Sequence, residues 1–159
     1  MEFERFVTDN ADSLLRTAYL ITWDLHDAED LVQETLLKTA KRWPKVRRMD
    51  HPTAYARRIL VNEALSGGPR RARARAELTG VSTPERASQQ PAADDDLLDG
   101  LRRLPPRQRA ALVLRYFLDL PETEVAAAMG VSLGTVKSTT SRGLARLEQT
   151  LSNDTRSIA

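Results

Sequence analysis

Apolar side chains recur every three or four positions along the first 65 residues, which is the pattern of amphipathic helices. The first stripe covers residues 3–22 and the second about residues 27–43. Pro44 is expected to end the second helix, because a proline disfavours helix continuation. The polar, basic segment 45–52 is expected to form a loop. A third helix is predicted from Pro52, a residue suited to a first helical turn.

The apolar pattern stops over residues 66–93, which contain three glycines, three prolines and few large apolar side chains. Such a segment buries too little surface to offset the cost of ordering it, so a flexible linker is predicted. Its start is basic, with arginines at positions 70, 71, 73 and 75. This run is alternatively a frayed extension of the third helix.

Helical periodicity resumes in the last third of the chain, where Asp94–Asp96 suit a helix N-terminus. Four helices are expected, over residues 97–104, 110–117, 121–129 and 133–151. Strand-like alternation is not persuasive anywhere, so the predicted fold class is all-α with two small helical domains. The expected division is 1–65 for the first domain, 66–93 for the linker, 94–152 for the second domain and 153–159 for a tail.

Composition narrows the possible chemistry. Aromatic residues make up only 5% of the chain, so the cores must be built mainly from Leu, Ala and Val. The absence of cysteine excludes disulfides and thiolate metal sites and fits a cytoplasmic protein. The two histidines, His26 and His51, are far apart in the sequence, so the chain offers few histidine side chains that could bind a metal together or act in catalysis. No apolar run approaches the roughly 18 residues that a membrane span needs, and the opening MEFERF does not resemble a signal peptide.

Charge alternates along the chain in four blocks, although the formal net charge is only +2. Residues 1–43 carry 5 basic and 9 acidic side chains, and residues 44–78 carry 9 and 3. Residues 79–100 carry 1 and 5, and residues 101–159 carry 9 and 5. The two basic blocks are therefore the candidate nucleic-acid surfaces.

The segment PETEVAAAMGVSLGTVKSTTSRGLARL (residues 121–147) has the pattern of a helix-turn-helix. Gly130 suits the positive φ of a tight turn, and Ser132 suits the N-cap of the following helix. That helix is expected to bury Val136, Leu144 and Leu147. Its polar face is expected to expose Thr135, Lys137, Ser138, Ser141, Arg142 and Arg146. In DNA-binding examples the second helix enters the major groove; the alternative is a helical hairpin with a solvated face.

Two long motifs resemble one family. LPPRQRAALVLRYFLDLPETEVAAAMGVSLGTVKSTTSRGLARL (residues 104–147) resembles region 4 of bacterial sigma factors, the domain that recognises the −35 element. AYLITWDLHDAEDLVQETLLKTAKRW (18–43), followed by HPTAYARRILVNEAL (51–65), resembles region 2 of the extracytoplasmic-function (ECF, group 4) class, in its actinobacterial SigE-like subgroup. Ser66–Pro69 depart from the usual continuation of the region 2 helix, and Thr139 and Thr140 replace a frequent Arg-Leu pair.

The resemblance implies three functional surfaces. Asp30, Gln33 and Glu34 fall on one helical face, with which the family docks on the β′ clamp helices of RNA polymerase. A −10 face is implied for Arg47, Arg48, Tyr55, Arg57, Arg58 and Asn62, although an aromatic on an amphipathic helix, such as Tyr55, is more often a core residue. A −35 face is implied for Thr135, Lys137, Ser138, Ser141 and Arg142, whose side-chain types contact phosphates and base edges.

The function implied by the resemblance is a promoter-specificity subunit that binds core polymerase, recognises both elements and helps to melt DNA. Its expected partners are core RNA polymerase (β′ clamp helices and β flap), promoter DNA and an anti-sigma factor. No enzymatic activity, cofactor, metal, membrane or small-molecule substrate is expected. Two alternatives remain, a stand-alone helix-turn-helix regulator and an adaptor or anti-sigma-type protein that does not bind DNA.

The linker also limits the domain arrangement. A flexible 28-residue tether has a root-mean-square span of about 26–32 Å. Two promoter elements one and a half turns apart are separated by roughly 50 Å. We therefore expect the free protein to be compact or variably arranged, with polymerase imposing the promoter-length separation.

Overall fold

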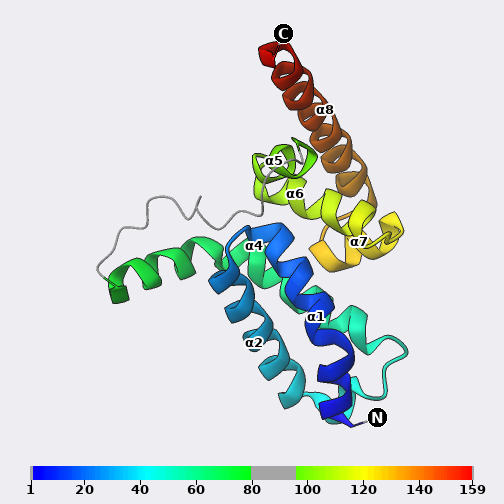
Figure 1. The fold of residues 1–159 in the computed structure, drawn as a ribbon. Helices are drawn as coiled ribbons and strands as arrows, with labels where there is room; N and C mark the ends of the chain where they lie inside the picture. Colours follow the sequence, from blue (N-terminus) through cyan, green and yellow to red (C-terminus); the bar gives the residue numbers. More distant parts are fainter. Residues whose placement is uncertain (1, 80–95, 159) are drawn as a thin grey trace.

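The computed structural model describes residues 2–79 and 96–158, and the described part is helical throughout its regular elements (Figure 1). The first group of helices is α1 (Phe3–Thr22), α2 (Leu25–Lys41), α3 (Trp43–Val46) and α4 (Pro52–Thr79). The second group is α5 (Asp96–Arg102), α6 (Pro106–Leu112), the π-helix η2 (Val113–Phe117), α7 (Glu122–Met129) and α8 (Leu133–Ile158). The all-α prediction with two helical domains is confirmed.

The N-terminal domain is built on α1, α2 and the first half of α4. Its buried core contains Phe6, Leu14, Ala18, Ala28, Leu31, Val32, Ala56 and Leu60. Trp43 closes one end of this core, with its ring centroid 5.3 Å from that of Phe3 and 5.2 Å from that of Phe6. Three of the eight aromatic residues of the chain thus pack together where α1 and α3 meet.

The boundaries of the first helices follow local chemistry. Trp23 ends α1 in the left-handed conformation, and its N–H donates to the Tyr19 carbonyl over 2.7 Å. Asp24 caps α2 by accepting a hydrogen bond from the Asp27 N–H over 3.0 Å. Helix α2 ends at Lys41, before Pro44, as predicted. The prediction of a loop from residue 45 is wrong at its start, because Lys45 and Val46 belong to the short helix α3, with Pro44 in its first turn, where its missing N–H costs nothing.

The helix expected to end at Leu65 continues to Thr79, so the prediction of a linker beginning at residue 66 is wrong for residues 66–79. The alternative of a helical extension is the correct one. Residues 70–78 are mostly Arg and Ala, which have high helix propensity, and they outweigh the glycines and proline at 67–69. Figure 1 shows this part of α4 projecting away from both domains. The rest of the expected linker, with Asp94 and Asp95, lies outside the described residues.

The C-terminal domain has an aliphatic core drawn from all of its helices, with Leu101, Leu114, Val125, Val136 and Leu147 among its buried members. Gly143 lets α8 approach α6 closely. A Cβ at this position would lie 3.3 Å from the Cγ and Cδ1 atoms of Leu112. After α6 the backbone widens into η2, so the helix expected over 110–117 is α-helical only in its first part.

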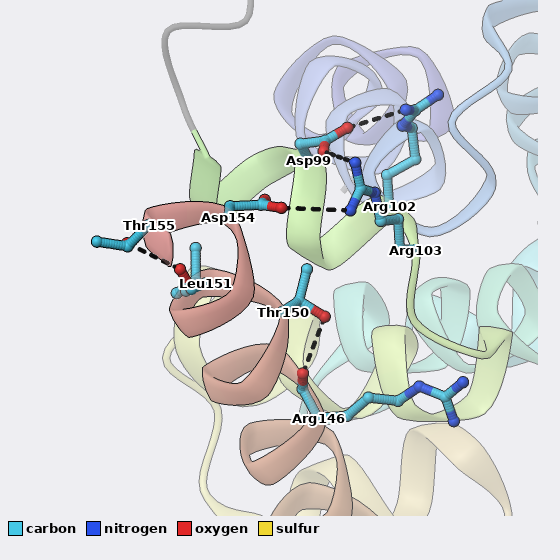
Figure 2. Close-up of polar contacts among 8 residues, drawn as sticks. All are labelled: Asp99, Arg102, Arg103, Arg146, Thr150, Leu151, Asp154 and Thr155. Carbon is cyan, nitrogen blue, oxygen red and sulfur yellow. Dashed lines mark hydrogen bonds and ion pairs between the residues drawn. The ribbon is translucent and has the colours of Figure 1, made fainter. Parts of the chain in front are cut away.

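Helix α8 continues to Ile158, so the predicted end near Leu151 and the predicted tail from residue 153 are wrong. The extension is anchored to α5. Asp99 lies 2.8 Å from Arg103 and 2.9 Å from Arg102, and Arg103 reaches Asp154 of α8 at 3.9 Å (Figure 2). The Thr155 hydroxyl donates to the Leu151 carbonyl over 2.9 Å, which is consistent with an unbroken helix.

The two domains contact each other directly. Ile21 of α1 and Val61 of α4 are buried in the core cluster of the C-terminal domain, not in that of their own domain. Figure 1 shows α6 near the C-terminal end of α1, where Arg109 donates to the Ile21 carbonyl, whereas α7 packs on α4. The contact places the helix-turn-helix next to the face of α4 that carries predicted −10 residues.

Candidate polymerase and promoter interfaces

The predicted polymerase face lies on α2, opposite the buried side of that helix. Asp30 and Gln33 are exposed and Glu34 is half-buried, whereas Leu31, Val32 and Thr35 point into the core. The structure therefore brings the three residues together as expected. Glu34 Oε1 lies 4.0 Å from the Lys38 ammonium, which also pairs with Glu63 of α4. This pairing ties the polymerase face to the helix that carries the −10 face.

An apolar residue extends the polymerase face, and the sequence analysis missed it. Leu37 follows Gln33 by four residues and Glu34 by three, and it is 63% exposed. The apolar period places Leu36 on the buried stripe with Val32 and leaves Leu37 off it, so an exposed leucine beside Gln33 and Glu34 could have been found from the sequence. Leu36 packs against the core. The face therefore combines carboxylates with one exposed leucine.

The predicted −10 face is divided between two places. Arg47 and Arg48 are exposed after α3, and Arg47 lines a groove with Phe3 and Trp43. Tyr55 is half-buried near the start of α4, and Arg58 is exposed. These four residues thus lie just after α3 and in the first two turns of α4.

Arg57 and Asn62, the other two residues of the −10 face, lie toward the C-terminal domain. The Arg57 side chain is only 18% exposed, and its Nη1 atom lies 3.9 Å from Oε2 of Glu124 in α7. Burial lowers the pKa of Arg57, and the Glu124 carboxylate partly offsets this by raising it. Asn62 is exposed overall, but its Oδ1 atom lies 3.7 Å from the position of a Cβ built on Gly130.

The helix-turn-helix has the local geometry that its sequence predicts. Gly130 has a φ of +68°, which glycine adopts at little cost, and its N–H donates to the Ala126 carbonyl. The Val131 N–H donates to the same carbonyl over 3.1 Å. Ser132 Oγ then accepts from the Thr135 N–H over 3.1 Å, which confirms Ser132 as the N-cap of α8.

The predicted −35 face is presented to solvent at the start of α8. Thr135, Lys137, Ser141 and Arg142 are exposed and Ser138 is half-buried, while Val136 is fully buried beneath them. The Thr135 hydroxyl lies 2.9 Å from Ser132 Oγ, so part of its hydrogen-bonding capacity serves the cap. The −35 face is therefore an ordered surface on a capped helix.

One expectation for the buried side of α8 needs revision. Leu144 is 41% exposed, so the prediction that it is buried is wrong; Leu147 fills the core one turn later. Leu144, Leu147 and Leu151 instead line an apolar groove of about 410 Å³. On another side of α8, Arg142 and Arg146 line a second groove with Gln108 and Gln149. Arg146 thus prolongs the basic edge of the −35 face.

The described residues contain no group of three or more His, Asp or Glu side chains placed to hold a metal ion. Among the helices of residues 2–79 and 96–158, none combines the length and apolar content that a membrane crossing requires.

The sequence matches two family models in the order that the structure shows. Residues 6–75 match the model of sigma-70 region 2, and residues 94–147 match that of sigma-70 region 4. The chain is 39% identical to the RNA polymerase sigma-E factor of Streptomyces coelicolor, over 95% of this chain and 86% of that protein. It is 34% identical to the ECF RNA polymerase sigma factor SigE of Mycolicibacterium smegmatis, over 94% and 61% respectively.

Solved structures agree with these matches. The sigma factor RpoE of Bartonella quintana, in complex with the anti-sigma factor NepR, superposes with a TM-score of 0.72 at 27% identity, covering 94% of this chain and 96% of that one. CnrH, in complex with the cytosolic domain of CnrY, shares the fold with a TM-score of 0.66 at 23% identity, over 96% and 88%. The chain belongs to the ECF class of sigma-70 family sigma factors, the transcription initiation factors that bind core RNA polymerase, recognise −35 and −10 promoter elements and promote DNA melting.

Proposed function

We propose that this sigma factor divides its work among the three surfaces described above. The polymerase face of α2 docks on the β′ clamp helices, the −10 face holds the melted strand, and the −35 face enters the major groove. The observation that carries the proposal is the geometry of α8. A left-handed glycine and a serine cap place the −35 face at the exposed N-terminus of a helix whose opposite side is buried.

The −10 step needs positive charge and a platform for unpaired bases. Arg47, Arg48 and Arg58 supply exposed guanidinium groups, and Tyr55, three residues before Arg58 on α4, supplies a half-buried aromatic ring. Arginine suits phosphate because its planar group donates two parallel hydrogen bonds. We therefore assign strand capture to the turn before α4, with Arg57 and Asn62 completing the surface farther along that helix.

The domain assignment that we propose is region 2 for α1 to α4 and region 4 for α5 to α8. The protein acts as a specificity subunit and not as an enzyme, because its surfaces bind and position DNA while the polymerase performs the chemistry. We place it in the cytoplasm, where core polymerase and promoters are found. Since RpoE of B. quintana is seen with an anti-sigma factor, we propose that a protein of that class also restrains this chain.

Charge reversal on α2 tests the polymerase face. The double variant Asp30→Lys/Glu34→Lys should assemble poorly with core polymerase, because both side chains lie on the exposed side of α2 and their reversal turns attraction into repulsion. A matched control, Glu4→Lys/Asp12→Lys, makes the same charge change at exposed positions of α1. Assembly is measured by sedimentation, and output by run-off transcription from a promoter mapped in induced transcripts.

The same experiment separates the alternatives. A stand-alone helix-turn-helix regulator would bind its DNA without polymerase and would not lose activity in the α2 variant. An adaptor that does not bind DNA would support no promoter-specific transcript. Normal holoenzyme assembly by Asp30→Lys/Glu34→Lys would contradict the assignment of the polymerase face.

A further inference from the structure

Three apolar side chains lie close to the N-cap of α8, and they have different surroundings. Val131, directly before Ser132, packs against the core of the C-terminal domain, and Val136 is fully buried in that core. These two residues occupy the positions of the apolar pair that commonly fixes the entry of a chain into a helix. Leu133 lies between them and is 40% exposed. The start of the helix therefore does not use Leu133 for its own packing.

Leu133 projects from the tip of the helix. It is the first residue of α8, and the residues on either side of it are the small Ser132 and Gly134. A Cβ built on Gly134 would first meet Ser132 Oγ, 4.0 Å away, apart from the adjoining residues and the helix backbone. Side chains of an α-helix lean toward its N-terminus. Leu133 is therefore a large apolar group that leans toward whatever the start of α8 approaches.

The position of Leu133 makes it continuous with the −35 face. Lys137 follows it by four residues and Ser141 by eight, so the three side chains lie in one strip along the helix. Both polar residues of the strip are exposed. The strip thus begins with an apolar group and continues with an ammonium group and a hydroxyl. It fits a partner that offers an apolar group beside phosphates and polar base edges.

The major groove of duplex DNA offers this combination. Thymine presents its C5-methyl group there, whereas unmodified adenine, guanine and cytosine present nitrogen, oxygen and N–H groups. The N-terminal residues of a recognition helix are the ones that contact base edges. Exposure alone does not mark a contact, because protein surfaces carry many apolar atoms. The place of Leu133, at the tip of this helix and in one strip with Lys137 and Ser141, is what indicates one.

We propose that Leu133 is a specificity-determining residue of the −35 face, which contacts the C5-methyl group of one thymine in the −35 element. The inference rests on the proposed entry of α8 into the major groove. It adds an apolar contact to the polar contacts of that face, and this contact favours a T·A pair at one position. Removing one methyl group from an apolar contact corresponds to about a fourfold loss of affinity.

A deoxyuridine scan of the −35 element tests the contact, because deoxyuridine pairs as thymidine does but lacks the methyl group. Each thymine of a mapped −35 element, on either strand, is replaced in turn, and holoenzyme affinity for the promoter fragment is measured by competition. Wild type should lose about fourfold at one thymine. Leu133→Ala should bind the unmodified promoter several-fold more weakly and should no longer distinguish thymine from deoxyuridine at that position.

The protein and DNA changes are combined because loss of a methyl group also alters the shape and stiffness of DNA. That second effect would persist in Leu133→Ala, so the loss of discrimination in the variant assigns the methyl contact to Leu133. Leu133→Met keeps an apolar side chain of similar volume and should retain discrimination.

A matched control is available in the other domain. Leu25 is the first residue of α2, follows the N-cap Asp24 and is 45% exposed. Leu25→Ala should therefore leave both the affinity and the discrimination at the wild-type level. Thermal melting followed by circular dichroism checks that each variant folds.

Equal affinity of wild-type holoenzyme for thymine and deoxyuridine at every −35 position would overturn the inference, and so would unchanged discrimination in Leu133→Ala. Lys137→Ala and Arg142→Ala, tested on the same fragments, separate this failure from failure of the proposed function. If they weaken or relax −35 recognition, the −35 face stands without the methyl contact. If they leave preference and affinity unchanged, α8 does not read the −35 element, and the proposed function of this face fails as well.

Discussion

The two faces proposed to hold DNA, the −35 face and the −10 face, differ in how they are exposed to solvent. The −35 face occupies one capped helix end, is fixed from beneath by Val136 and is open to solvent. The −10 face is spread over the turn after α3 and along α4, and its Arg57 is paired with a carboxylate of the other domain. The proposed −35 face is open to solvent in this structure, whereas part of the proposed −10 face is covered by the other domain.

This difference follows from the DNA that each face meets. A duplex already exists before polymerase arrives, so a rigid helix can be prepared for its major groove. The melted strand appears only during initiation, and a permanently open basic surface would bind other single strands through nonspecific charge. In this structure Glu124 of the C-terminal domain pairs with Arg57 and so covers part of the proposed −10 face.

The largest expected effect comes from destroying the C-terminal domain core. Val136→Asp places a carboxylate at a fully buried position, with a cost on the order of several kcal/mol. Duplex binding through the −35 face should be lost. Binding of the free chain to a −10 single strand should rise, because the covering domain no longer packs on α4. Ala145→Asp, at an exposed position of α8, is the control and should change neither affinity. If Val136→Asp lost affinity for both the −35 duplex and the −10 single strand, the assignment of the two DNA types to separate faces would be contradicted.

The next effect separates base from phosphate contacts within the −35 face. Removing Arg142 should cost about 1–3 kcal/mol and relax preference at one base position, if it makes a bidentate base contact. If Lys137 holds a phosphate, Lys137→Ala should weaken binding by a similar factor for all −35 sequences and should reduce the salt dependence of the affinity. Run-off transcription from a panel of single-base −35 variants distinguishes the two, with holoenzyme assembly as the control. Wild-type preference and strength in both variants would make α8 a packing element.

The −10 face should show a defect in melting more than in initial binding. Arg57→Ala and Asn62→Ala should depress open-complex formation in the holoenzyme, measured by permanganate footprinting. A promoter with a pre-melted −10 bubble should partly rescue both variants, because strand separation is then already supplied. Failure of the bubble to rescue them would indicate lost folding or lost polymerase binding.

The smallest expected effect is on the stability of the C-terminal domain, which carries the −35 face. The Thr140 hydroxyl is buried and has no hydrogen-bond partner among the described residues. Thr140→Val keeps the shape and removes this unsatisfied group, so it should stabilise the C-terminal domain by about 1 kcal/mol. Thr123→Val, at an exposed position of α7, is the matched control. Calorimetry measures the free energy of unfolding of both variants. A lower stability of Thr140→Val would show that the Thr140 hydroxyl makes a hydrogen bond in solution.

Local features of this chain were predictable from its sequence because their causes are local. The Gly130 turn, the Ser132 cap and the apolar spacing of α1 and α2 each depend on residues within a few positions of one another. The same reasoning failed for α4. Glycines and a proline near position 68 favoured a break, yet the Arg- and Ala-rich stretch that follows continues the helix to Thr79.

The contacts between domains were not predictable in this way. Glu124 and Arg109 look like ordinary polar residues of surface helices, and their partners Arg57 and Ile21 lie far away in sequence. Leu144 was expected in the core because it fits the apolar period, but Leu147 fills that space and Leu144 lines a groove. The packing of one domain on the other reveals the partners of Glu124 and Arg109, and the packing within the C-terminal domain reveals the position of Leu144.

The most direct measurement is fluorescence anisotropy of the wild-type chain, free and in holoenzyme, with two probes from one mapped promoter: a −35 duplex and a −10 single strand. The unequal presentation of the two faces predicts that the free chain binds the duplex measurably and the single strand poorly, and that holoenzyme binds both. A free chain that binds the single strand as tightly as holoenzyme does would contradict it.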